Sequence, residues 1–166
     1  MIVQANLVIG ADGSTTFHGS SKGLSSAVDR ERFHKLRQSA QVILIGGNSA
    51  RNEPYAKTPT RLIVVTADKN LESKLGNPLA EFWNEAPLGV IAKLQSEGIQ
   101  SVLIEGGVNL LKPLLRAKVI DDFYLTKSSK FDGENKIDLA DLLSGYKLFL
   151  KEIVGDEEFC HFKPER

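Results

Sequence analysis

The sequence predicts an α/β fold with a mixed, mainly parallel sheet that is flanked by helices and ends in antiparallel strands. Strand-like and helical segments alternate along most of the chain, and the C-terminal part contains strands alone. The 166 residues and the 42% hydrophobic content suit one domain, residues 1–166, with a single core. The parallel part of the sheet is predicted from three short apolar runs typical of strands covered on both faces, residues 41–45, 62–65 and 100–104.

The first quarter of the chain predicts a strand, a loop and a helix. Residues 3–9 predict a buried strand, which the turn-forming residues 10–14 end. A loop rich in glycine and serine follows over residues 19–25. Ser26 then suits a helix N-cap because Asp29 lies three residues further on, and apolar residues at helical spacing extend the helix to about residue 39.

The second half predicts two helices and an antiparallel tail. The helices are expected over residues 88–97 and 108–118. A strand is expected over residues 121–127, and residues 147–154 and 157–163 suit a hairpin around a Gly-Asp turn.

The segment between residues 68 and 87 predicts no strand. Four apolar residues keep a roughly fourfold spacing, but a Gly-Asn-Pro sequence interrupts it. The apolar residues are Leu71, Leu75, Leu79 and Phe82.

Composition and charge exclude several classes of function. The 21 basic and 21 acidic residues are evenly mixed and sum to zero, so neither a nucleic acid nor an anionic membrane is an expected partner. The apolar runs are far shorter than the roughly 20 residues that span a bilayer, and the start of the chain shows no secretory signal. The single Cys160 excludes an internal disulfide, and the three histidines share no metal-ligand spacing. We expect a cytoplasmic protein without a metal site.

Two predicted strands end in paired glycines and continue towards a helix. One junction is Gly46-Gly47 followed by Ser49, and the other is Gly106-Gly107 followed by Asn109. Each pair alone is more simply a tight turn, since neither is a complete dinucleotide fingerprint. Together, at the carboxyl ends of parallel strands, they indicate two helix N-termini that could bind a diphosphate.

Several polar residues are candidates for a site near these turns. Glu105 occupies the last position of its strand, where a structural residue would more often be apolar, so we expect its carboxylate to face the cleft. Asn6 lies inside a strand, where an amide suggests a ligand or a polar partner. Asp12 by itself suits an ordinary turn, and Arg51 and Glu53 could face either the cleft or solvent.

In this order, the motifs resemble the pyrimidine reductase domain of riboflavin biosynthesis, which in many bacteria is the C-terminal half of a bifunctional deaminase/reductase. The resemblance spans most of the chain. Its most specific stretch runs from the Gly-Ser-Ser-Lys-Gly-Leu-Ser-Ser of residues 19–26 to the Arg-Asn-Glu-Pro-Tyr of residues 51–55. A second stretch covers residues 98–111, which include Glu-Gly-Gly, and continues to residues 119–122.

The resemblance implies a dihydrofolate-reductase-like fold, a homodimer, NADPH as cofactor and hydride transfer to C1 of a ribosylamino-pyrimidine phosphate, a pyrimidine nucleotide. The family pattern assigns Asp12 and Glu105 to the catalytic site. It assigns substrate binding to Asn6, Ser25, Arg37 and Glu53, and cofactor binding to Gly46, Gly47, Ser49, Thr66, Lys69, Gly106, Gly107 and Asn109. Thr66 and Lys69 are expected near the adenosine 2′-phosphate.

The chain also departs from the family pattern. Gly10 replaces a usual serine, no deaminase domain is present, and the family's further strands have no expected counterpart between residues 68 and 87. A shortened wall around the adenosine would leave NADPH binding weak. Two alternatives therefore stay open: a dihydrofolate-reductase-like enzyme with another substrate, and a shortened, non-catalytic nucleotide-binding paralogue.

Overall fold

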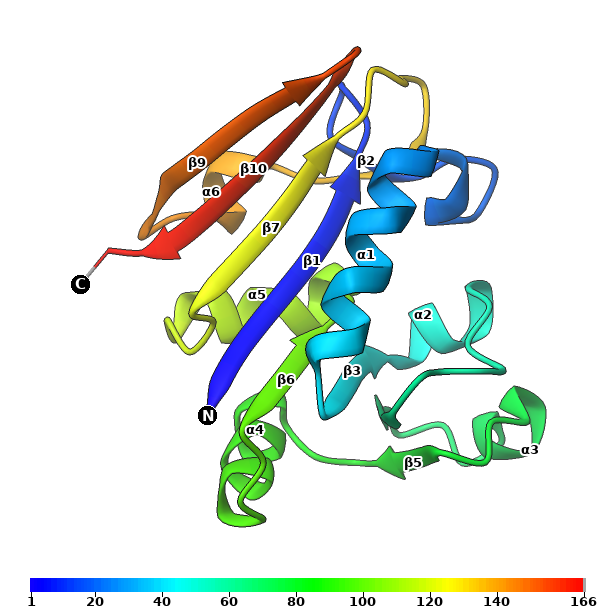
Figure 1. Cartoon of the computed structure of the whole chain (residues 1–166). Coiled ribbons are helices and arrows are strands. Elements are labelled where there is room, and N and C mark those ends of the chain that lie inside the picture. Colours follow the sequence, from blue (N-terminus) through cyan, green and yellow to red (C-terminus); the bar gives the residue numbers. More distant parts are fainter. Residues whose placement is uncertain (166) are drawn as a thin grey trace.

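An eight-stranded sheet in the order β5-β4-β3-β6-β1-β7-β10-β9 forms the centre of the structure (Figure 1). The computed structural model describes residues 1–165. The strands from β5 to β7 are parallel, and β10 runs antiparallel to both β7 and β9. Their bounds are β1 (Ile2–Ile9), β3 (Val42–Gly46), β4 (Arg61–Val65), β5 (Ala80–Trp83), β6 (Ser101–Ile104), β7 (Asp122–Lys127), β9 (Tyr146–Val154) and β10 (Glu157–Pro164).

The three predicted parallel strands are confirmed, and they lie side by side as β4, β3 and β6. The four apolar residues of β3 are fully buried because strands flank it on both edges and side chains pack against both of its faces. Val42 and Leu44 join one hydrophobic cluster, whereas Ile43 and Ile45 join a second cluster on the opposite face. This alternation explains why the strand is apolar at every position.

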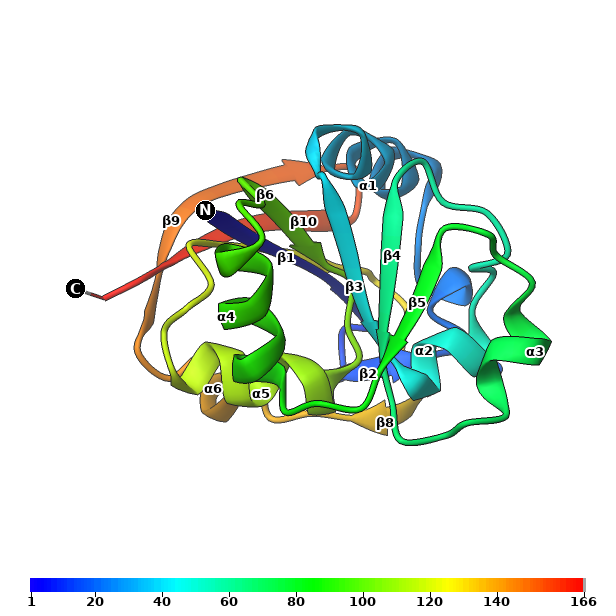
Figure 2. The ribbon, with the colours of Figure 1, turned by 90° about the horizontal axis from the view of Figure 1, so that it is seen from below.

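Helices cover the two faces unequally. Seen from below, α1 (Ala27–Ser39) lies on one face, and α4 (Pro87–Ser96), α5 (Val108–Arg116) and α6 (Leu139–Leu142) lie on the other (Figure 2). The predicted cap of α1 is confirmed, since the Ser26 side chain accepts a hydrogen bond from the Asp29 backbone N–H at 3.0 Å. In the described part of the chain, no helix is both long and apolar enough to cross a membrane.

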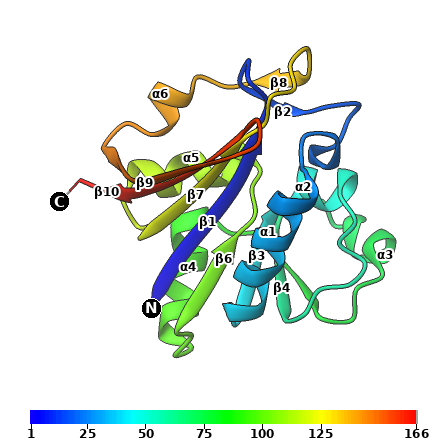
Figure 3. The same cartoon turned by 45° about the horizontal axis from the view of Figure 1, so that its top comes forward.

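Five small elements complete the fold, and the sequence patterns did not define them. They are a 3-10 helix (Ser21–Gly23), α2 (Gly47–Asn52), α3 (Leu71–Leu75), and the two strands of a small sheet, β2 (Ser14–Thr16) and β8 (Glu134–Lys136). The β2 and β8 strands lie beyond the carboxyl end of β1 (Figure 3). Gly10 stands at this end of β1, where a Cβ atom would collide with the Ser14 hydroxyl and the Lys130 carbonyl oxygen. This close approach accounts for the departure from the usual serine.

The prediction that residues 68–87 contain no strand is wrong. The fourfold spacing is genuine only across α3, where Leu71 and Leu75 are buried, and Gly76 ends that helix in a left-handed conformation. The chain then turns and forms β5, whose Ala80 and Phe82 pair with Leu62 and Val64 of β4. The strand is short, lies at the sheet edge and has an exposed Glu81, so its pattern is weak. The chain therefore keeps a strand where a shortened fold was expected.

The turn before β5 generates a prediction about stability. The buried Asn77 amide donates hydrogen bonds to the Tyr55 carbonyl at 2.9 Å and to the Thr58 hydroxyl at 3.0 Å. Asn77→Ala should lower the free energy of unfolding by about 1–3 kcal/mol, because it leaves buried polar groups without partners. Urea denaturation measures this loss. Asn70→Ala is the matched control, since the Asn70 side chain makes no capping bond to α3; equal losses in the two variants would contradict the prediction.

Candidate active site

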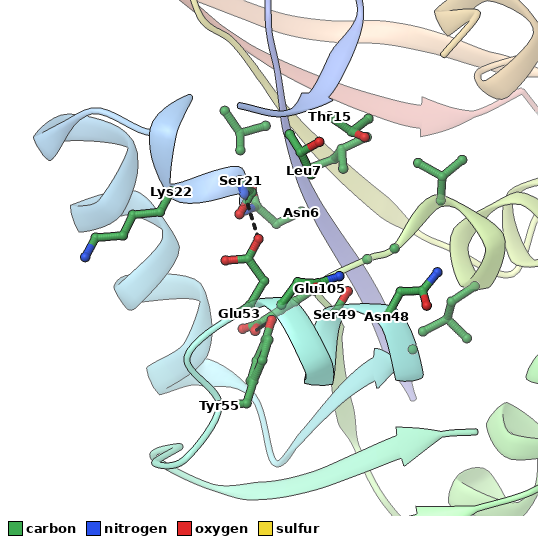
Figure 4. A pocket seen from close by; sticks show the side chains of 18 of the residues that line it. Asn6, Leu7, Thr15, Ser21, Lys22, Asn48, Ser49, Glu53, Tyr55 and Glu105 are labelled. Atoms are coloured by element: carbon green, nitrogen blue, oxygen red, sulfur yellow. Dashed lines mark hydrogen bonds between the residues drawn. The ribbon is translucent and has the colours of Figure 1, made fainter. Parts of the chain in front are cut away.

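A cavity of about 1030 Å³ opens at the carboxyl ends of the parallel strands (Figure 4). This volume is at the upper end of the roughly 300–1,000 Å³ typical of small-molecule sites. Its wall includes the ends of β3, β4 and β6, part of β1, the starts of α2 and α5, one side of α1, and residues near β2 and β8. The site thus lies where open parallel sheets usually bind ligands.

The two double-glycine turns lie next to each other in this wall, as predicted. The Gly46 N–H donates a hydrogen bond to the Gly106 carbonyl at 3.2 Å, which continues the pairing of β3 with β6. Helices α2 and α5 start directly after these turns, and neither has a side-chain cap at its N-terminus. Their first N–H groups are therefore available to bind an anion.

Glycine is required at two positions of these turns. A Cβ atom on Gly47 would lie 2.8 Å from the Thr66 hydroxyl oxygen, so α2 can start beside β4 only with a hydrogen at this position. Gly106 has a φ of +81°, which L side chains rarely adopt. The peptide bond between Gly106 and Gly107 is cis.

A buried group of three side chains forms the floor of the cavity on the α1 side. The Arg37 guanidinium donates two hydrogen bonds to the two oxygens of Glu105, both at 2.7 Å. The Tyr55 hydroxyl donates a third to Glu105 at 2.8 Å, and Figure 4 shows Tyr55 directed towards this carboxylate. Only 12% of the Arg37 side chain and 1% of the Glu105 side chain are exposed. Arg37 also lies over the Phe33 ring, 4.3 Å from its centre.

The protonation states in this group follow from its surroundings. Burial and the charge of Glu105 raise the pKa of Tyr55 well above its usual value, so the hydroxyl stays protonated as a donor. Burial would lower the pKa of Arg37, but its hydrogen bonds to Glu105 and the charge of that carboxylate raise it. Glu105 therefore faces two permanent donors. Its carboxylate is held in the wall, and its position suits a role in holding Arg37 and Tyr55 more than direct contact with a ligand.

Glu53 holds the glycine- and serine-rich loop against the cavity. Its carboxylate accepts a hydrogen bond from the Ser20 hydroxyl at 3.0 Å. It accepts another from the Ser21 N–H at 2.6 Å (Figure 4). At the other end of this loop, the Ser25 hydroxyl donates to the buried Asp29. The loop is therefore fixed at both ends by carboxylates, and its residues can form a defined side of the cavity.

Most of the residues predicted for the site lie in the cavity wall. Arg51, whose direction the sequence left open, also lies there and donates hydrogen bonds to Asn48 and Asp68. The predicted residues in the wall are Asn6, Ser25, Arg37, Gly46, Gly47, Ser49, Glu53, Thr66, Glu105, Gly106, Gly107 and Asn109.

Asp12 and Lys69 are not among the residues of the cavity wall. Asp12 pairs with Lys136 at 2.8 Å and accepts hydrogen bonds from Ser14 and from the Asp132 N–H, so it joins β2 to the segment that contains β8. The hydrogen bond from Lys136 holds the pKa of Asp12 well below its usual range. Such a carboxylate cannot supply a proton near neutral pH. Lys69 is exposed beyond the end of β4.

Several residues of the wall had no role predicted from the sequence, among them Tyr55 and Lys136. Tyr55 was part of the quoted motif, but its contact with Glu105 joins residues 50 positions apart. Lys136 comes from β8, whose three residues are all exposed and show no periodicity. No local signal in the sequence marks either residue as part of the cavity.

A model of the RibD C-terminal domain family matches residues 1–154. The chain belongs to the RibD C-terminal domain family. A relative of this chain, the riboflavin biosynthesis protein RibD of Aquifex aeolicus, is 33% identical to it over 127 residues. That match covers 66% of this chain and 34% of the relative, so the chain spans about a third of the curated protein's length.

Solved structures agree with this fold. A Thermotoga maritima diaminohydroxyphosphoribosylaminopyrimidine deaminase/5-amino-6-(5-phosphoribosylamino)uracil reductase aligns with a TM-score of 0.76 at 18% identity, over 98% of this chain and 56% of that one. A pyrimidine reductase-like protein of Corynebacterium diphtheriae aligns with a TM-score of 0.75 at 16% identity, over 99% of this chain and 92% of that one. Dihydrofolate reductase from Enterococcus faecalis, solved with NADP(H), aligns with a TM-score of 0.71 at 15% identity, over 99% of this chain and 97% of that one. The fold of this RibD C-terminal domain is dihydrofolate-reductase-like.

The buried ion pair generates a second prediction. Glu105→Leu should lower the free energy of unfolding by about 3–5 kcal/mol, because Arg37 would remain buried without its partner. Combining it with Arg37→Met should recover much of the loss, since an apolar pair removes both charges. Urea denaturation of the single and double variants measures both values.

The Arg32–Glu152 pair provides the control for this experiment. It has the same chemistry, but its side chains are 40% and 54% exposed. Glu152→Ala should cost less than about 1 kcal/mol. If Glu105→Leu cost no more than Glu152→Ala, the buried pair would not have the structural role assigned to it.

Proposed function

We propose that this chain is an NADPH-dependent oxidoreductase that reduces the ribosyl group of a ribosylamino-pyrimidine phosphate to ribityl in riboflavin biosynthesis. Membership of the RibD C-terminal domain family supports the reaction class. The observation that carries the proposal is the direct contact of the two double-glycine turns, Gly46 to Gly106, at the mouth of two uncapped helices. A cytoplasmic location and a homodimeric state accompany the proposal as implications of the family.

The residues at the turns fit a dinucleotide. NADPH, when bound, supplies the hydride, so the protein needs to orient the reactants more than to form covalent bonds. The N–H groups at the starts of α2 and α5 would hold the diphosphate, with Ser49 and Asn109 beside them. Thr66 and Arg51 border the cavity near β4 and suit the adenosine 2′-phosphate. In this proposal Arg51 takes the place of Lys69.

The remaining part of the cavity suits a polar substrate. The Asn6 amide lines the wall and makes no side-chain hydrogen bond to any of residues 1–165, so its donor and acceptor are free for a pyrimidine edge. Ser25 and Glu53 border the same space from the ordered loop. Arg37 and Tyr55, held by Glu105, would fix the polar floor on which the ribose hydroxyls are oriented. We assign Glu105 the role of a positioning residue, and Asp12 has no role in this proposal.

The two alternatives now differ in support. The non-catalytic reading rested on a missing wall between residues 68 and 87, and β5 occupies that segment. The expectation of weak NADPH binding rested on the same missing wall, so it no longer has a structural reason. A dihydrofolate-reductase-like enzyme with a different substrate is the main alternative to the proposed function, because a structural similarity at 15% identity shows the fold alone.

The reaction itself provides the third prediction. Anaerobic incubation with 5-amino-6-(5-phosphoribosylamino)uracil and NADPH should consume the absorbance band of the reduced nicotinamide, with the ribityl product identified by mass spectrometry. Dihydrofolate is the control substrate and should give no consumption. Turnover of dihydrofolate alone would replace the proposed substrate, and absence of NADPH binding by calorimetry would refute the cofactor.

The choice between Arg51 and Lys69 provides the fourth prediction. Arg51→Gln should weaken NADPH binding at least tenfold and leave NADH binding unchanged, because a charged hydrogen bond to the 2′-phosphate is worth about 1.5–3 kcal/mol. Lys69→Gln is the matched control and should change neither affinity, since Lys69 is outside the cavity wall. Calorimetry at low salt measures both. Equal weakening of NADPH and NADH by Arg51→Gln would contradict a role specific to the 2′-phosphate.

A further inference from the structure

Asp29 is a buried carboxylate in the cavity wall to which the proposed reaction gives no role. It stands in the first turn of α1, is only 4% exposed and lines the cavity. Its Oδ2 atom accepts a hydrogen bond from the Ser25 hydroxyl at 2.5 Å. Within residues 1–165 the carboxylate has no other hydrogen bond or ion pair, and no fully enclosed side-chain oxygen lacks a partner. The Oδ1 atom is therefore open to the cavity and free to accept a hydrogen bond.

Two cations of this region bond backbone carbonyls instead of Asp29. The Arg30 guanidinium donates to the Ser25 carbonyl at 2.9 Å. The Lys130 ammonium donates to the Gly23 carbonyl at 2.6 Å. A buried carboxylate without an opposite charge is costly unless hydrogen bonds satisfy both of its oxygens. A ligand that brings a donor to Oδ1 would supply the bond that the chain itself leaves out.

Asp29 belongs to a stripe of α1 that faces the cavity. Asp29, Phe33 and Arg37 recur at every fourth position, so they lie on one side of the helix, and all three line the cavity. The stripe is about 12 Å long, because each helical residue rises about 1.5 Å. It presents a hydrogen-bond acceptor, an aromatic ring and, at its far end, the guanidinium that Glu105 holds. Such an order suits a flat heterocycle with an N–H at one edge and polar groups beyond it.

The chemistry of a carboxylate restricts what can bind at Oδ1. An ionised carboxylate accepts hydrogen bonds and donates none, so its partner has to be an N–H or O–H group. The Asn6 amide, which lines the same cavity, can serve as donor or acceptor and therefore cannot fix which edge of a pyrimidine it meets. Asp29 can, because a carbonyl or phosphate oxygen turned towards it would leave acceptors facing each other. A ring N–H beside the Phe33 ring meets both requirements.

We propose that Asp29 is a specificity-determining residue of the cavity, which accepts a hydrogen bond from a ring N–H of the pyrimidine. The inference rests on the proposed function for its choice of ligand. It adds a residue that the family pattern did not assign, and it gives the pyrimidine one orientation along α1. Ser25 keeps the carboxylate in place through the bond to Oδ2.

Glu157 provides a matched control for Asp29. It is 6% exposed, and its carboxylate accepts a hydrogen bond from the Ser26 hydroxyl at 2.5 Å. Ser26 is the N-cap of α1, so both carboxylates bond a serine at the same end of this helix. Neither Ser26 nor Glu157 is among the residues of the cavity wall. Glu157→Gln therefore changes the same kind of buried contact and leaves the cavity as it is.

Binding of a pyrimidine fragment to the full chain tests the contact without any reaction. The probe is 5,6-diaminouracil, which has both ring N–H groups but no ribose or phosphate, and its 1,3-dimethyl derivative has neither ring N–H. Chemical-shift titration should show that the wild-type chain binds the probe at least tenfold more tightly than the derivative, because a hydrogen bond to a charged group is lost. Asp29→Asn should weaken binding of the probe at least tenfold and lower this preference to about threefold or less. Glu157→Gln should change neither value.

The outcomes separate this inference from the proposed function. A wild-type chain that binds both compounds equally, or does not bind the probe, overturns the inference whether or not the variants fold. Equal weakening by Asp29→Asn and Glu157→Gln also overturns it, because Asp29 would then only stabilise the start of α1. Wild-type KM for the ribosylamino-pyrimidine phosphate in Asp29→Asn would refute the inference and keep the proposed function. Asp29-dependent binding of the probe, in a chain that does not reduce that substrate, would refute the proposed function and keep the pyrimidine contact.

Discussion

The parallel pairing of β3 with β6 is the constraint on which the candidate site depends. These strands are separated by more than 50 residues of sequence, yet their register continues into the hydrogen bond between Gly46 and Gly106. The carboxyl ends of both strands therefore lie side by side at the same edge of the sheet, and α2 and α5 begin beside each other. Two partial positive charges at one place attract a diphosphate more strongly than either helix alone. The remaining walls of the cavity are arranged around this point.

The Arg37–Glu105–Tyr55 group connects three segments that the sheet alone would leave independent. Arg37 comes from α1, Glu105 follows β6, and Tyr55 follows α2. A charge pair buried to this extent gives little net stability, but it tolerates only one arrangement, since any displacement leaves a buried charge without its partner. The group therefore specifies the position of α1 over the sheet. Through Glu53 and Ser21 the same region also fixes the loop that precedes α1.

The sequence predicted what depends on local patterns and missed what depends on distant contacts. The buried strands, the Ser26 cap and the terminal hairpin follow from residue spacing, and all are confirmed. Strand β5 was missed because an edge strand with an exposed Glu81 needs only partial apolar character. The roles of Asp12 and Lys69 stay predictions from the family pattern, and the structure places both residues outside the cavity wall. The family pattern could not show that Asp12 pairs with Lys136, more than 120 residues away. Tyr55 was overlooked for the converse reason, because its partner Glu105 is distant in sequence.

The division of the sheet into a parallel and an antiparallel part has a physical consequence for both faces. Parallel strands need crossover connections, and the helices in those connections cover the sheet from β4 to β1. The antiparallel strands β9 and β10 are joined by a tight turn, so they bring no helix with them. One side of β7, β10 and β9 therefore receives no helix from the connection between β9 and β10. The same topology that collects the strand ends into a cavity thus leaves β9 largely exposed, whereas β3 in the parallel part is buried.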